Sequence, residues 1–146
     1  MSYIPTHFTW PELLPESIYR ELELVKRLDR CALFLDDRIL ITADRLRQRY
    51  GKLVCNTWFF GGQHQFRGYR PQGCGVGALL SQHRFGRALD LVPVQATAAE
   101  IRADIRAHPE LEAFGHITCV EDGVGWLHVD CRNRDRAGQG ILFVKP

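Results

Sequence analysis

Hydrophobic residues recur at helical spacing in three stretches of the chain, which predicts helices over residues 16–30, 36–50 and 97–108. Asp36 or Asp37 can cap the second helix, because a short polar side chain satisfies free backbone N–H groups there. Thr97 opens the third helix, with Glu100 three residues later, as in a capping box. The stripe of the first helix is formed by Ile18, Leu22, Val25 and Leu28.

Short runs of alternating apolar and polar residues predict strands, since successive side chains of a strand point to opposite faces. The predicted strands cover residues 52–56, 87–93, 117–121, 126–132 and 141–144. The Asp-Gly-Val-Gly sequence at 122–125 is typical of a turn, so the third and fourth strands are expected to form an antiparallel hairpin. Helices precede most strands, which indicates an α+β fold with helices packed on a small, mainly antiparallel sheet.

Two segments lack this periodicity. Residues 1–13 are expected to form an irregular N-terminal arm, because prolines interrupt regular structure there. Residues 57–80 contain six glycines, which indicates loops with unusual backbone angles or close approaches. We find no repeat and no long linker, and 146 residues fit one domain, so we interpret residues 1–146 as a single domain.

Composition narrows the choice of partners. A formal charge of +2 is too balanced to indicate binding to nucleic acid or insertion into an anionic membrane. The N-terminus lacks a signal peptide, and no apolar run reaches the ~18 residues of a membrane span, so synthesis and retention in a cytoplasm are expected. The five cysteines have irregular spacing and no CxxC pair, which favours reduced, mostly buried thiols.

Three side chains form a candidate metal site. His83 follows the glycine-rich stretch, Asp90 lies in the predicted strand 87–93, and His128 lies in the strand 126–132. Two imidazoles and one carboxylate are a typical ligand set for catalytic Zn²⁺, which keeps a further position for water or substrate. The same ligands accept other divalent metals, so zinc is the first choice rather than the only one.

The order of residues around these ligands resembles a known family. Residues 81–90 read SxHxxGxAxD, and residues 126–130 read WxHxD. Both motifs resemble the zinc D-alanyl-D-alanine metallopeptidases, which include cell-wall carboxypeptidases, vancomycin-resistance dipeptidases and phage endolysins and share their fold with the Hedgehog signalling domain. Residues 68–71 (GYRP) match the arginine-bearing segment of this family, and residues 56–62 (NxWxxGG) resemble small phage-encoded members. The resemblance covers roughly residues 8–133.

The resemblance implies one zinc ion on His83, Asp90 and His128, with Arg70 binding substrate and polarising its carbonyl. It implies a monomeric zinc peptidase that cleaves the peptidoglycan stem peptide after release to the cell wall, as a phage or prophage endolysin does. D-Ala-D-Ala carboxypeptidase and L-Ala-D-Glu endopeptidase activities both remain open. The alternative is a non-catalytic zinc-bearing binding module, as in Hedgehog-type domains. Arg67 is close enough in sequence to Arg70 to be an alternative candidate for binding substrate and polarising its carbonyl.

The catalytic base departs from the family pattern, since Gly125 stands where many members have glutamate. If residues 123–124 form a two-residue turn, Glu121 pairs with Trp126 and lies on the face of His128, about 7–8 Å away on the diagonal. Glu121 is therefore predicted as the general base. If the strand register is shifted by one residue, Asp122 lies on the face of His128 instead and becomes the candidate.

Three further residues have expected supporting roles near the metal. Asp130 shares the face of His128 and can orient either that imidazole or Arg70. Ser81 is expected either to hydrogen-bond a ligand or to close a turn. Trp126 is expected to pack in the interior or, alternatively, to contact substrate.

Overall fold

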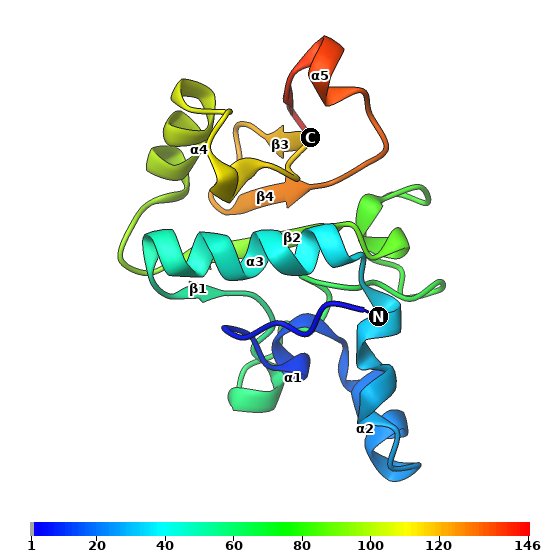
Figure 1. Cartoon of the computed structure of the whole chain (residues 1–146). Helices are drawn as coiled ribbons and strands as arrows, with labels where there is room; N and C mark the ends of the chain where they lie inside the picture. The colour runs from blue at the N-terminus through cyan, green and yellow to red at the C-terminus, as the bar shows by residue number, and fades with distance from the viewer. Residues whose placement is uncertain (1) are drawn as a thin grey trace.

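The structure is a computed structural model that describes residues 2–146, and it contains one open, mixed and mostly antiparallel sheet (Figure 1). The strand order is β1-β2-β4-β3-β5, and only the pair β3 and β5 is parallel. This confirms the predicted α+β class. The strands are β1 (Leu53–Val54), β2 (Ala88–Pro93), β3 (Cys119–Glu121), β4 (Leu127–Asp130) and β5 (Leu142–Val144).

The second and third predicted helices are present as α3 (Asp37–Tyr50) and α4 (Ala98–Ala107). Asp36 caps α3 by accepting a hydrogen bond from Arg38 N, and α4 begins after the predicted capping box. The remaining helical elements are α1 (Trp10–Leu13), α2 (Glu16–Leu24), α5 (Arg136–Gln139) and the 3₁₀ turns η1 (Leu28–Phe34), η2 (Trp58–Phe60), η3 (Gln82–Phe85) and η4 (Glu112–Phe114).

Alternation along the central strands gives the sheet one apolar and one polar face. Leu89 and Leu91 of β2, with Leu127 and Val129 of β4, are fully buried in the hydrophobic core. Helix α3 lies along β2 and adds its own buried stripe to this core (Figure 1). The intervening residues of β2 and β4 point to the opposite face, and that face contains the candidate metal ligands.

The prediction of an irregular arm over residues 1–13 is wrong for its last four residues, because residues 10–13 form the one-turn helix α1. Glu12 accepts a hydrogen bond from the backbone N–H of Thr9 at 2.8 Å, which stabilises the first turn. Pro11 lies in that turn, where a missing N–H costs nothing. The arm is anchored by Phe8, Leu13 and Leu14, which are buried in the core.

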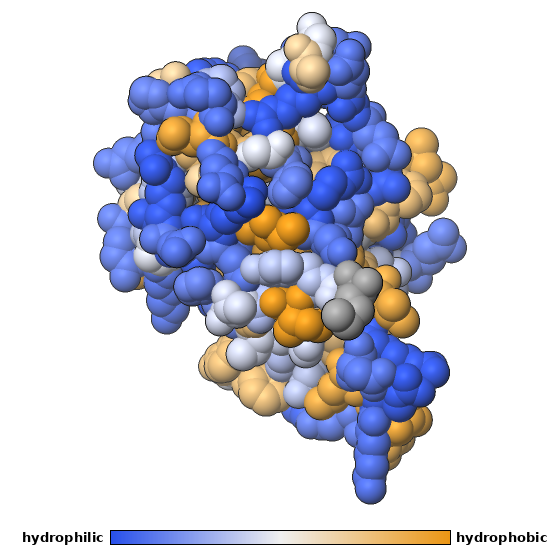
Figure 2. All heavy atoms as spheres, in the orientation of Figure 1, coloured by the Kyte–Doolittle hydropathy of each residue, from blue (hydrophilic) through white to orange (hydrophobic). Residues whose placement is uncertain are grey.

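The predicted helix over residues 16–30 is too long, since α2 ends at Leu24. Lys26 has a positive φ of 55°, which ends the helix before the turn η1 begins. Helix α2 buries none of its residues and extends away from the sheet (Figure 1). Leu24 and Val25 are exposed near its end, and Figure 2 shows hydrophobic patches beside hydrophilic residues in that projecting part.

The predicted hairpin exists, but its register differs by two residues. Cys119 pairs with Asp130, which is two residues away from the register in which Glu121 would pair with Trp126, because the connection is longer than a two-residue turn. A shift of two residues keeps every side chain on its face. Continuing the observed register places Glu121 directly opposite His128, closer than the diagonal position that the sequence predicted.

The thiols match the expectation from the sequence. All five cysteines are free, and four are buried, with Cys74 of the glycine-rich segment partly exposed. Within residues 2–146, no helix is long and apolar enough to cross a bilayer.

Candidate metal centre

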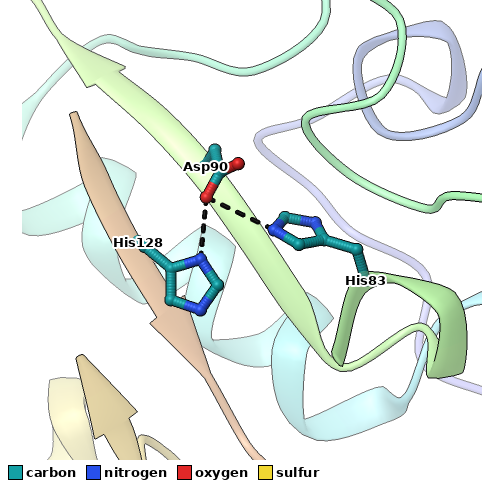
Figure 3. Close-up of side chains that lie close together, drawn as sticks. All are labelled: His83, Asp90 and His128. Carbon is teal, nitrogen blue, oxygen red and sulfur yellow. Dashed lines mark hydrogen bonds and ion pairs between the residues drawn. The ribbon is translucent and has the colours of Figure 1, made fainter. Parts of the chain in front are cut away.

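His83, Asp90 and His128 meet on the polar face of the sheet although they come from three separate elements (Figure 3). Asp90 lies in β2 directly opposite His128 of β4, so strand pairing fixes their distance. His83 comes from the turn η3, just before β2. Gly86 ends that turn with φ of 67°, and a Cβ there would lie 2.2 Å from Phe34 O. Only glycine therefore fits this position, which places His83 beside the strand.

The three side chains converge on one point. One ligand atom from each lies within 4.8 Å of the other two. Asp90 Oδ1 is 2.8 Å from His128 Nδ1 and 3.3 Å from His83 Nε2, and the two imidazole rings have centroids 5.2 Å apart (Figure 3). The side chains of both histidines are at most 6% exposed. This buried His-Asp-His group has the composition and spacing of a metal-binding site.

The hydrogen bond of His83 leaves its metal-facing nitrogen free. His83 Nδ1 lies 2.8 Å from the carbonyl oxygen of Gly68, which can only accept, so Nδ1 carries the proton. In the neutral ring, Nε2 then presents a lone pair, and this buried atom has no hydrogen-bond partner. A lone pair directed at a carboxylate oxygen is repelled by it unless a cation lies between them. The unpaired Nε2 thus fits a bound metal ion.

His128 is held on its other side by a second carboxylate. Its Nε2 lies 3.0 Å from Oδ2 of Asp130, whose side chain is fully buried. Arg132 donates to the same carboxylate through Nε at 2.8 Å and Nη2 at 2.6 Å. Asp130 therefore fixes the ring so that Nδ1 faces Asp90, an arrangement typical of metal-bound imidazoles.

Burial and hydrogen bonding act in opposite directions on the charged groups of the site. Burial disfavours the charged imidazolium, but hydrogen bonds with Asp130 and Asp90 raise the pKa of His128 to about 9. Burial also disfavours the Asp90 carboxylate, yet the hydrogen bond from His128 and the neighbouring imidazole of His83 hold the pKa of Asp90 well below its usual range. The carboxylate is thus ready to bind a cation, which would displace the proton from His128.

Arg70 contacts the other oxygen of Asp90. Its Nη2 donates to Asp90 Oδ2 at 3.0 Å, while Nε donates to the carbonyl of Phe66 at 2.7 Å. Nη1 lies 3.4 Å from Ser81 Oγ, so Ser81 contacts the guanidinium rather than a ligand atom. These contacts orient Asp90 with Oδ1 toward the imidazoles and keep a positive charge beside them.

A half-open cavity of about 490 Å³ lies over the three ligands. Glu121 lines it, with Oε1 4.0 Å from His128 Nδ1 and the side chain 22% exposed. Asp122 instead forms an ion pair with Arg106 of α4, outside the cavity. Of the two carboxylates weighed from the sequence, Glu121 is the one beside the ligands.

A second cavity of about 320 Å³ shares Asp90 and Trp126 with the first as lining residues. Trp126 is 42% exposed and lines both cavities, so the expectation of a packed interior residue is wrong. Arg67 lines the second cavity, and its Nη1 donates to the carbonyl of Cys55 at 3.3 Å. The carbonyl oxygen of Arg67 also accepts a hydrogen bond from the backbone N–H of Asp90 at 2.8 Å. Arg67 therefore contacts only the backbone of this residue, whereas the guanidinium of Arg70 contacts the Asp90 carboxylate.

Two parts of the site were missed from the sequence. Arg132 holds Asp130, and its position two residues later, on the same strand face, was a readable signal. The carbonyl of Gly68 holds His83, and no side-chain pattern indicates it. A Cβ on Gly68 would lie 2.2 Å from Leu13 O, so the close approach of the N-terminal segment explains the glycine.

No family model, curated protein or solved structure matches this chain, so the site is interpreted from its geometry and from its sequence motifs.

Proposed function

We propose that this chain is a zinc-dependent peptidase that cleaves a peptide bond in the stem peptides of bacterial peptidoglycan. The observation that carries the proposal is the convergence of His83 Nε2, Asp90 Oδ1 and His128 Nδ1 beneath a cavity that also contains Glu121. Three protein ligands at the base of an accessible cavity are characteristic of catalytic rather than structural zinc sites.

Zinc fits the donor set better than the harder cations, because two of the three donors are imidazole nitrogens. When bound, zinc supplies a Lewis acid that polarises a carbonyl and acidifies water. His83 and His128 would hold it through nitrogens whose partners on the opposite ring edge, Gly68 O and Asp130, are already in place.

Glu121 is proposed as the general base. Its carboxylate lies in the cavity wall beside His128, where it can accept a proton from the attacking water and return it to the leaving amine. Arg70 is proposed to stabilise the negative charge that develops on the carbonyl oxygen, because its guanidinium lies in the same cavity. Its bond to Asp90 also keeps that ligand in position.

The resemblance of the SxHxxGxAxD and WxHxD motifs to the zinc D-alanyl-D-alanine metallopeptidases supports the choice of substrate. On this proposal the α+β arrangement is of the Hedgehog and D-Ala-D-Ala-peptidase type. The protein would act as a monomer on the cell wall after release, as a phage lysin does. Both D-Ala-D-Ala carboxypeptidase and L-Ala-D-Glu endopeptidase activity are compatible with these motifs.

Digestion of purified peptidoglycan tests the proposal. The zinc-loaded protein should release fragments whose masses identify the cleaved bond, and a chelator should stop the release. The variant His83→Ala serves as the control, because it removes a ligand while leaving Glu121 and Arg70 in place. Cleavage that survives the chelator would refute the zinc mechanism, and zinc retention without any cleavage would favour the non-catalytic binding module.

A further inference from the structure

The cavity over the candidate metal ligands is the first of three cavities that are linked by shared lining residues. It shares Asp90 and Trp126 with the second cavity, and the second cavity shares His64 with a third one of about 610 Å³. Adjacent cavities with common walls can hold one extended ligand. The third cavity is lined by Glu12, Arg47, Lys52, Val54, Asn56, Thr57, Phe60, Gly61, Gly62, Gln63 and His64.

The wall of the third cavity is a preformed loop over residues 57–64. The carbonyl of His64 accepts hydrogen bonds from the N–H groups of Thr57 at 2.8 Å and Trp58 at 3.2 Å. The N–H of His64 donates to Thr57 Oγ1 at 3.1 Å, and that of Gly62 donates to Thr57 O at 2.9 Å. A Cβ on Gly62 would lie 2.2 Å from Thr57 Oγ1, so the tight closure requires glycine. Such a loop loses little conformational freedom when it binds a ligand.

This loop presents an aromatic ring that folding does not explain. Phe60 is 64% exposed, although its ring lies edge-on to Phe59 with centroids 5.4 Å apart. Phe59 in turn packs against Trp58, whose indole N–H donates to Leu14 O at 2.9 Å. Trp58 therefore anchors the turn η2, Phe59 is partly exposed, and the Phe60 ring faces solvent at the cavity.

The polar groups around Phe60 are mostly neutral. Glu12 and Arg47 form an ion pair at 2.6 Å and compensate each other, which leaves Lys52 as the one uncompensated charge of the lining. Gln63 and His64 are exposed and can hydrogen-bond hydroxyl or acetamido groups. An exposed ring beside neutral hydrogen-bonding side chains suits a sugar, which has an apolar C–H face and a polar edge.

We propose that the third cavity binds the amino-sugar backbone of peptidoglycan, an inference that rests on the proposed function. The sugar ring lies on Phe60 with its polar groups toward Gln63 and His64. The attached peptide then follows the second cavity, past Trp126, to the metal ligands. The chain thus recognises glycan and peptide with one groove, and its preferred substrate is a peptide that still carries its sugar.

A binding measurement tests this site without any hydrolysis. Soluble glycan strands stripped of their peptides are titrated into the protein and followed by NMR. Phe60→Ala should weaken binding at least about tenfold, as truncation of a stacked aromatic anchor does. The control Phe85→Ala removes a ring that is 50% exposed but lies outside all three cavities, and it should bind as the wild type does. Equal thermal unfolding midpoints show that both variants are folded.

In the binding measurement, the glycan site would be overturned by absence of binding to the wild-type protein or by equal binding of Phe60→Ala. A dimer that Phe60→Ala dissociates in sedimentation would also overturn it, by making this face an interface between copies. Because these readouts need no cleavage, their failure leaves the proposed peptidase activity untouched. In cleavage assays, Phe60→Ala should lower kcat/KM for the glycan-bearing substrate alone. An equal loss of kcat/KM on the free stem peptide would contradict a role of Phe60 in binding the sugar.

Discussion

Asp130 provides a sharp test of how the metal centre is built. Its buried carboxylate accepts hydrogen bonds from His128 Nε2 at 3.0 Å and from the guanidinium of Arg132 at 2.6 and 2.8 Å. The substitution Asp130→Asn keeps the size of the side chain but replaces one acceptor oxygen by an NH₂ donor. An NH₂ group at the Oδ2 position would face both His128 Nε2 and Arg132 Nη2. An NH₂ group at the Oδ1 position would face Arg132 Nε, and the bond to His128 would then go to a neutral oxygen in place of a charged one.

The expected effect is on metal affinity. Loss of a carboxylate that orients a ligating histidine typically weakens metal binding 10- to 100-fold, which is about 1.4–2.7 kcal/mol. Asp130→Asn should therefore raise the Kd for zinc by about one to two orders of magnitude. Competition with a chromophoric chelator measures this Kd, and urea unfolding shows what fraction of the variant is folded.

The matched control is Asp122→Asn in the neighbouring hairpin. Asp122 forms an ion pair with the half-exposed Arg106 outside the cavity, so its loss should cost at most about 1 kcal/mol of stability and leave zinc binding unchanged. If folded Asp130→Asn binds zinc as tightly as the wild type, the idea that Asp130 orients His128 is wrong.

Three further substitutions test separate parts of the account. Glu121→Gln should keep zinc binding but lower the rate of peptide cleavage at least about 100-fold, and a fully active variant would remove Glu121 as the base. Gly86→Ala should lower the free energy of unfolding by more than about 1 kcal/mol in urea titration, because its Cβ would collide with Phe34 O; an unchanged midpoint would contradict this. Asp44 is buried, but hydrogen bonds from the N-terminal arm, led by the N–H of Thr6, lower its pKa. The stability that its carboxylate contributes to the folded protein is therefore present above pH ~4 and is lost as the pH falls through the lowered pKa. Asp44→Asn should therefore destabilise the protein by about 2 kcal/mol at pH 7 and less at pH 3, measured by urea unfolding at both pH values; an equal loss at both would contradict this assignment.

The candidate metal ligands were predictable because local motifs and, for Asp90 and His128, strand alternation are properties of the sequence. The two-residue period of β2 and β4 places Asp90 and His128 on the face opposite Leu89 and Leu91. The face of Glu121 was also predictable, although its exact partner was not. The length of the hairpin connection decides the register, and turn residues alone did not reveal that it was longer than two residues.

Other features depend on contacts between distant segments. Helix α2 stops at Leu24 although no glycine or proline follows, because Lys26 takes up a positive φ. The conformation around Gly68 depends on the approach of Leu13, 55 positions earlier in the chain. Helical periodicity and residue type describe the local chain only, so neither could predict these two features.

The central claim is that His83, Asp90 and His128 together bind one zinc ion. Crystals grown with one equivalent of zinc, measured on both sides of the zinc absorption edge, test it most directly. We expect one anomalous peak at about 2.0–2.2 Å from His83 Nε2, Asp90 Oδ1 and His128 Nδ1. A zinc ion held by other atoms, or no peak between these three side chains, would contradict it.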